Sequence, residues 1–243
     1  MRTDTRSPAW PHGELTPFLD ELWYVMGTNR VHHAGVDLQT SRTMLVVKDG
    51  EHLTLVNTVR LDDDGLLALD ALGKVRDVVR LGAFHGRDDP FYRERYDARL
   101  WAVSGSAHAD GRVEDHALVE RGELPIAGAS AYVFRTARHP EAALLLERSG
   151  GVLVTCDAVQ SWASVDRFFS PETGAAFEAA GLIRPAHVPS TWIEACAPDA
   201  SDFERLLALP FRHLVSAHGV PLLDDAHERL AKDVGTLRQA TRA

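Results

Sequence analysis

The sequence has 243 residues and a formal net charge of −9, and hydrophobic residues make up 45% of it. This length is enough for a large hydrophobic core within one domain. The acidic balance disfavours broad binding to nucleic acids, because their phosphate backbone repels a negative protein. No apolar run reaches the roughly 18–20 residues that a membrane-spanning helix needs. We therefore expect a small-molecule substrate or ligand, and neither nucleic acid nor membrane as a partner.

The N-terminal segment and the cysteines indicate the compartment. Residues 1–21 are polar, contain three prolines and lack the basic-then-apolar profile of a signal peptide. Cys156 and Cys196 are widely spaced and lie outside any Cys-x-x-Cys pair, so a thiolate zinc site is not expected. The sequence thus predicts a cytoplasmic protein with reduced thiols. We expect a single domain over residues 1–243, in which residues 1–14 are flexible.

The first half of the chain has the apolar patterns of strands separated by helices. Strands are predicted at 22–26, 43–48, 52–57, 75–81 and 100–103. Asp49-Gly50 is a strong hairpin signal between the second and third of these strands. Helices are predicted at 62–72, which Gly73 follows, and at 91–96, where Pro90 fits the first position.

The second half has the same pattern of apolar strands followed by helices. Strands are predicted at 131–136, 142–147, 152–156 and 212–217, and helices at 171–180 and 224–239. The sequence Ser201-Asp202-Phe203-Glu204 has the form of a capping box that opens a further helix. Residues 105–128 have little periodicity and are predicted to be a solvated loop, with one short strand at 117–120. Two groups of strands, each followed by helices, favour two sheets covered by outer helices.

Polar residues directly follow three of the predicted strands. His85, with Asp88 and Asp89, follows one of them, Asp157 follows another and His218 a third. Side chains at strand ends project from a rigid scaffold into the layer of loops where active sites form. Imidazole and carboxylate ligands suit zinc, iron(II) or manganese.

Several segments together resemble the metallo-β-lactamase fold, a superfamily that includes glyoxalase II-like thioesterases, lactonases and phosphodiesterases. The resemblance covers roughly residues 15–235 and rests on segments 44–58, 75–89, 125–130, 144–157 and 214–219. Segment 75–89 is similar to the strand and loop that carry the family's His-x-His-x-Asp-His motif. The resemblance implies an α/β fold, a four-layer αββα sandwich. It also implies metal-dependent hydrolysis of an ester, thioester or phosphoester.

The central motif is incomplete, because His85 is its only histidine. Judged by strand length, His85 takes the place of the second histidine, which leaves Ala83, Arg87 and Asp88 in the other positions. With a small insertion, His85 takes the first place and Asp89 falls where the motif has its aspartate. Both registers remain open from the sequence.

Other family ligands are missing too. Gly128 or Ala129 stands where a further histidine belongs, and Asn57 replaces the aspartate of the family's Asp-Thr-Gly turn. A complete two-metal site needs more ligands than this chain offers. If Arg87 points inward, its fixed charge would take the place of one metal ion and pair with Asp157.

The resemblance thus implies at most one zinc or iron ion, held by His85, Asp157 and His218, or none. Asp88 or Asp89 would then be the catalytic group that orients or deprotonates water. The structural alternatives are that His85 is an ordinary loop histidine, that Asp157 and His218 are turn residues, and that Asp88 or Asp89 caps the helix that follows. The functional alternative is a non-catalytic, metal-free protein that binds a small molecule or serves in an assembly.

Overall fold

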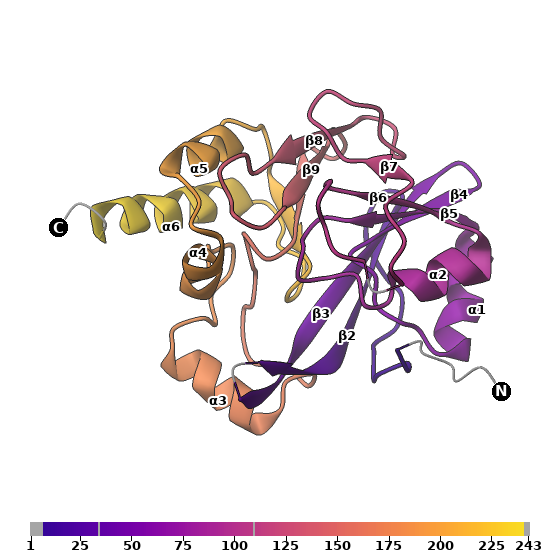
Figure 1. The fold of residues 1–243 in the computed structure, drawn as a ribbon, viewed down its shortest axis with the longest axis horizontal. Coiled ribbons are helices and arrows are strands. Elements are labelled where there is room, and N and C mark those ends of the chain that lie inside the picture. Colours follow the sequence, from indigo (N-terminus) through magenta and orange to yellow (C-terminus); the bar gives the residue numbers. More distant parts are fainter. Residues whose placement is uncertain (1–6, 34, 109, 241–243) are drawn as a thin grey trace.

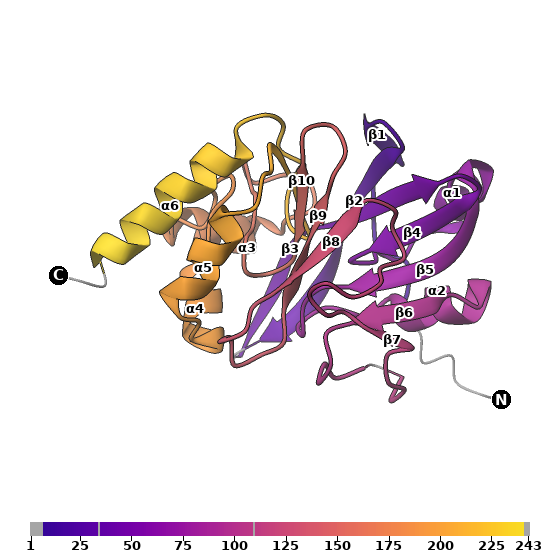
Figure 2. The ribbon, with the colours of Figure 1, turned by 90° about the horizontal axis from the view of Figure 1, so that it is seen from above.

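The computed structural model describes residues 7–33, 35–108 and 110–240. Two β-sheets pack face to face, and helices cover both outer faces (Figure 1). Seen from above, the layers follow one another as helices, sheet, sheet and helices (Figure 2). The predicted four-layer αββα sandwich is therefore confirmed.

The first sheet has seven strands in the order β1-β2-β3-β4-β5-β6-β7. They are β1 (Thr16–Leu19), β2 (Leu22–His33), β3 (Val36–Asp49), β4 (His52–Val56), β5 (Lys74–Arg80), β6 (Arg99–Ala102) and β7 (His116–Ala117). β1 to β4 are antiparallel neighbours, whereas β4 to β7 run parallel. The predicted hairpin at Asp49-Gly50 joins β3 to β4, and Gly50 has the positive φ of 63° that this turn requires.

The second sheet has four strands in the order β11-β10-β9-β8. They are β8 (Ala129–Val133), β9 (Ala142–Leu146), β10 (Val152–Thr155) and β11 (His213–Ser216). β10 and β11 are parallel, and the other pairs are antiparallel. Every residue of β9, β10 and β11 is buried, as expected for strands that are covered on both faces.

The helices divide between the two outer faces. They are α1 (Asp63–Leu72), α2 (Asp89–Tyr96), α3 (Pro171–Ala179), α4 (Ser190–Cys196), α5 (Ala200–Leu207) and α6 (Ala226–Ala240). α1 and α2 cover the first sheet, and α4, α5 and α6 cover the second (Figure 1). The side chain of Asp62 caps α1 by accepting a hydrogen bond from the Gly65 N–H. None of the helices in the described ranges is long and apolar enough to cross a membrane.

The core between the two sheets aligns the strand ends that carry the polar residues. Apolar side chains of β3 and β5, such as Val47 and Val79, meet those of β9, β10 and β11, such as Leu144, Val154 and Val215. Burying apolar surface stabilises the folded state by about 25 cal/mol per Å², so this layer contributes most of the stability of a sandwich. The loops after β5, β10 and β11 are therefore anchored on one rigid core.

Three parts of the structure differ from the sequence-based expectation. β2 and β3 extend as a ribbon well beyond the predicted strands, and α3 packs against β3. The helix predicted from the capping box forms as α5, but it begins at Ala200 with Asp199 at the N-cap position, so Ser201 does not cap it. The Asp202 carboxylate accepts hydrogen bonds from the N–H groups of Arg135 and Thr136. Helix α4 was not predicted, because its seven residues are too few to show periodicity.

The segment 105–128 is also better anchored than expected. The His108 ring is buried and lies within hydrogen-bond distance of Arg80 and Glu114. Asp115 accepts hydrogen bonds from Arg93. Charged pairs, which carry no periodicity, therefore hold this segment to the first sheet.

The N-terminal segment, expected to be flexible over residues 1–14, is described only from residue 7. The Pro11 carbonyl accepts a hydrogen bond from the Thr28 N–H, and the Gly13 N–H donates to the Met26 carbonyl. This part of the chain therefore lies alongside β2.

Candidate functional site

His85, Asp157 and His218 meet in one cluster, which we call the triad. The Nε2 atoms of the two histidines are 3.1 Å apart. The Asp157 Oδ1 atom lies 3.0 Å from the His218 Nε2 atom and 3.3 Å from that of His85. Three polar atoms from distant parts of the sequence thus form a nearly equilateral triangle.

The topology explains why these residues meet. β10 and β11 are parallel neighbours, so Asp157 and His218, which follow them closely, lie at the same edge of the second sheet. His85 comes from the loop after β5 in the first sheet. The backbone of that loop is tied to the second sheet, because the Ala83 N–H donates to the Pro140 carbonyl.

The orientation of His218 is fixed by its surroundings. Its Nδ1 atom lies 3.2 Å from the Ser41 carbonyl, and a carbonyl only accepts hydrogen bonds, so Nδ1 carries the proton. Its ring packs edge-on against Trp162, whose indole N–H donates to the Ser41 hydroxyl. The Nε2 atom of His218 therefore faces His85 and Asp157.

The triad is almost fully enclosed, and its electrostatics follow from that. The side chains of His85, Asp157 and His218 are 6%, 12% and 11% exposed. Burial lowers the pKa of His85, and the charge of Arg42 adds to that shift. Burial alone would raise the pKa of Asp157, but His85 and His218 outweigh it and hold this pKa well below its usual range.

Asp88 and Asp89 lie near the start of α2, but neither side chain caps the helix. Asp88 occupies the N-cap position and makes no capping hydrogen bond. Its Oδ2 atom instead accepts hydrogen bonds from Arg42 and from the Arg60 N–H. Asp89 accepts a hydrogen bond of 2.6 Å from the Thr58 hydroxyl, and burial raises its pKa. Both carboxylates point inward, so the alternative in which one of them caps the helix is not what the structure has.

Two buried arginines beside the cluster were not singled out from the sequence. Arg42, on β3, donates to Asp88 Oδ2 at 3.0 Å and to the Thr58 carbonyl at 3.1 Å. Arg80, at the end of β5, donates to the carbonyl of His85 and so supports the loop that carries this histidine. Both arginines lie within strands, where successive side chains point to opposite faces of the sheet. The sequence alone does not show which face is buried, so it does not show that these two side chains point inward.

Arg87 does not take the inward position that we considered for it. Its side chain is exposed, and its Nη1 atom donates to the carbonyl of Arg30 on β2. Arg42 is the guanidinium whose charge acts on the cluster. Ala83 and Arg87 thus contribute no ligand atoms in either register of the motif, and His85 is its only imidazole.

A second buried carboxylate and a thiol lie behind Asp157. Glu141 is 1% exposed and accepts hydrogen bonds from the Ala158 N–H and from the indole N–H of Trp192. Burial raises the pKa of Glu141 well above its usual range, and the charge of Asp157 adds to this shift. The Cys156 thiol lies 3.6 Å from Asp157 Oδ2, and ligand atoms of His85, Cys156 and Asp157 all lie within 4.8 Å of one another.

Both thiols are expected to be unreactive in the native protein. Burial raises the pKa of Cys156 well above its usual range and that of Cys196 to about 11. A thiol-specific chromogenic reagent should therefore label neither cysteine rapidly before unfolding and both afterwards. Rapid labelling of Cys156 in the folded protein would contradict this expectation.

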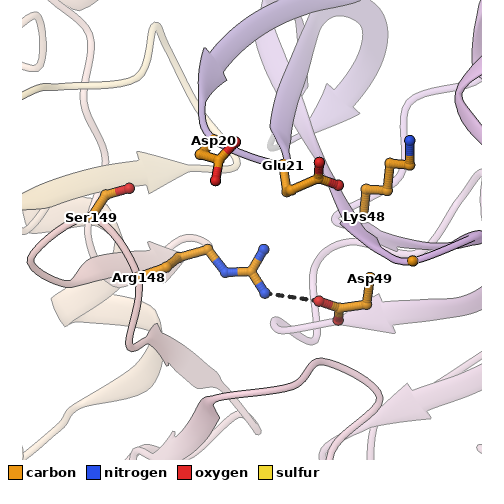
Figure 3. Close-up of a pocket in the computed structure, with 7 residues that line it drawn as sticks. Asp20, Glu21, Lys48, Asp49, Arg148 and Ser149 are labelled. Carbon is orange, nitrogen blue, oxygen red and sulfur yellow. Dashed lines mark hydrogen bonds and ion pairs between the residues drawn. The ribbon is translucent and has the colours of Figure 1, made fainter.

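A separate polar cavity of about 530 Å³ lies at the other end of the sandwich. Figure 3 shows its lining side chains, with Arg148 donating to Asp49. Arg148 and Ser149 precede β10, whereas Asp157 follows it, so the strand separates the cavity from the triad.

No protein-family model matches this sequence, and no curated protein matches it. Solved structures do match it. A metallo-β-lactamase from Erythrobacter litoralis has 16% sequence identity and a TM-score of 0.59, over 91% of this chain and 92% of that one. The metallo-β-lactamase DIM-1 has 13% identity and a TM-score of 0.61, over 93% and 100% of the two chains. FIM-1 from Pseudomonas aeruginosa, solved in a mono-zinc form, has 14% identity and a TM-score of 0.59, over 95% and 98%.

The architecture and these similarities define the class of fold. Two mixed sheets lie between outer helices and form an α/β sandwich, with polar side chains on the loops at one edge. The chain has the metallo-β-lactamase fold, as its sequence segments predicted. At 12–16% identity, the similarity establishes the fold alone.

Proposed function

We propose that this protein is a metal-dependent hydrolase with one metal ion, held by His85, Asp157 and His218. The triangle formed by their ligand atoms is the observation that carries the proposal. Its edges of 3.0, 3.1 and 3.3 Å match the roughly 3.3 Å that separates ligand atoms around tetrahedral zinc with bonds of about 2.0–2.1 Å.

The protonation pattern of the triad also suits a cation. When His218 is neutral, with its proton on Nδ1, its Nε2 atom presents a lone pair to Asp157 Oδ1, and two acceptors 3.0 Å apart repel each other unless a positive charge lies between them. His85 Nε2 can offer one proton to either atom, but not to both. A divalent ion, or an additional proton, would resolve this conflict.

The charges buried around the triad favour a divalent ion. Four buried carboxylates, those of Asp88, Asp89, Glu141 and Asp157, stand against the two buried guanidinium groups of Arg42 and Arg80. When all four are ionised, two negative charges remain uncompensated. Burial disfavours that state and raises the pKa of Asp89 and of Glu141, so a nearby cation is needed to stabilise it. One divalent cation balances this excess, whereas two would exceed it.

In this proposal some residues bind the ion and others accept a proton from water. A divalent ion supplies Lewis acidity and lowers the pKa of water, which suits hydrolysis of an ester, thioester or phosphoester. His85, Asp157 and His218 hold the ion. Asp88 and Asp89 each keep one buried oxygen without a hydrogen-bond partner among the described residues, and we assign to one of these the acceptance of a proton from water.

One observation favours the alternative, a metal-free protein that binds a small molecule or serves in an assembly. The triad side chains are at most 12% exposed, so a substrate can reach them only if the surrounding loops move. Under this alternative, an additional proton on the triad would replace the ion.

Metal analysis tests the proposal directly. The protein is unfolded, stripped of metal and refolded with excess zinc, iron(II) or manganese, and the tightly bound equivalents are measured by mass spectrometry. We expect one equivalent per chain, together with hydrolysis of at least one chromogenic ester, thioester or phosphodiester that needs the bound metal. Two tightly bound equivalents would contradict the mononuclear site, and none would favour the metal-free alternative.

A further inference from the structure

We propose that Glu141 is a positioning residue that sets the distance between His85 and Asp157 and thereby tunes the affinity of the triad for a divalent cation. This inference rests on the proposed function. Glu141 comes directly before β9, outside the segments that the family motifs cover, and has no contact with the triangle of ligand atoms among the interactions of the described residues. Its place in the fold nevertheless links both ligand-bearing loops.

The backbone around Glu141 holds the His85 loop. The Ala83 N–H donates to the Pro140 carbonyl at 3.0 Å, and the Ala142 N–H donates to the Leu81 carbonyl at 2.8 Å. Between these two bonds, Gly82 forms an isolated antiparallel bridge with Glu141. The start of the loop that carries His85 is therefore fixed to the residues on both sides of Glu141.

The side chain of Glu141 holds the Asp157 loop. Its Oε1 atom accepts a hydrogen bond of 2.5 Å from the Ala158 N–H, the peptide group that directly follows Asp157. Its Oε2 atom accepts a hydrogen bond of 2.7 Å from the Trp192 indole, which anchors the carboxylate against α4. The segment 140–142 thus joins the loop of His85 through its backbone, and Glu141 at its centre joins the loop of Asp157 through its carboxylate.

A carboxylate at this depth is costly unless it is satisfied, and both oxygens of Glu141 accept N–H groups. Hydrogen-bonded residues behind metal ligands orient those ligands, and their loss typically costs about 10–100-fold in metal affinity.

Glu141→Gln is the informative variant, because it keeps the size of the side chain but replaces one of its two acceptor oxygens with an NH2 group. Its amide nitrogen must face either the Ala158 N–H or the Trp192 indole, so one of the two hydrogen bonds is lost. We expect cobalt(II) and zinc to bind about 10–100-fold more weakly, as measured by competition with a chromophoric chelator. The visible d–d absorption of bound cobalt(II) should also change, because the position of Asp157 shifts.

Asp202→Asn is the matched control. Asp202 is also 1% exposed and also accepts backbone N–H groups, but it binds the segment 135–136 rather than a ligand-bearing loop. It should lower stability without changing the cobalt spectrum or the metal affinity. Equal losses of affinity in both variants, or an unchanged affinity in folded Glu141→Gln, would overturn the inference.

Amide hydrogen exchange of the unmodified protein adds a test that needs neither metal nor variant. The Ala158 amide should exchange only on global unfolding, because Glu141 holds it. Fast exchange at Ala158 would overturn the inference even if the triad binds metal. A refolded parent protein that binds no metal would instead overturn the proposed function and this inference together.

Discussion

Replacing His218 with alanine is expected to abolish metal binding, with a loss of affinity of more than about 100-fold, since a missing ligand should cost more than a lost supporting residue. The triad has only two imidazole ligands, and His218 is the one whose free lone pair is fixed by its hydrogen bond to Ser41. Without it, His85 and Asp157 alone hold the ion. The measurement is metal content after refolding in excess zinc, followed by removal of weakly bound metal.

The control for this experiment is His32→Ala. His32 is a histidine with a side chain 69% exposed, paired with Asp37 on the ribbon of β2 and β3. It should retain the metal content of the parent protein. Full zinc occupancy in His218→Ala would rule out the triad as the metal site.

Replacing Arg42 with methionine is expected to lower the free energy of unfolding by about 3–5 kcal/mol, because it leaves the buried carboxylate of Asp88 without its charge partner. Arg42 and Asp88 are 6% and 4% exposed, and their ion pair is 3.0 Å long. For a chain of this size, such a loss lowers the melting temperature by roughly 6–20 °C. Urea unfolding of the metal-free protein measures the change in the free energy of unfolding.

A double-mutant cycle separates the ion pair from simple packing. Asp88→Asn alone should also destabilise the protein, whereas the double variant Arg42→Met/Asp88→Asn should lose less than the sum of the two single losses. Arg87→Met is the matched control, since Arg87 is the exposed arginine next to Asp88 in the same loop. Strict additivity of Arg42→Met and Asp88→Asn would contradict the proposed pairing.

The sequence predicts the fold and the convergence of the triad because both follow from local patterns. Apolar runs that end at a polar residue show where β5, β10 and β11 stop, and parallel pairing brings the ends of β10 and β11 together. His85, Asp157 and His218 could therefore be identified before the structure was known. Their role as metal ligands stays a prediction, as does catalysis by Asp88 or Asp89.

The residues that surround the triad could not be predicted in the same way. Arg42 lies within a long strand, and Glu141 sits between a proline turn and a buried strand, so neither is part of a local motif. Their importance comes from contacts across 46 positions for Arg42 with Asp88, and across 17 for Glu141 with Ala158. Residues 201–204 show the converse, because they have the form of a capping box, yet α5 begins at Ala200 with Asp199 at its N-cap position.

The near-complete enclosure of the triad has a kinetic consequence. An ion that binds three side chains with at most 12% exposure must lose most of its hydration shell to enter. It can leave only when loops held by buried hydrogen bonds open, so exchange with the surrounding solution follows the rate of local unfolding. Residence times at the proposed site are then expected to be long, so we expect a purified sample to retain the ion that was abundant while the chain folded.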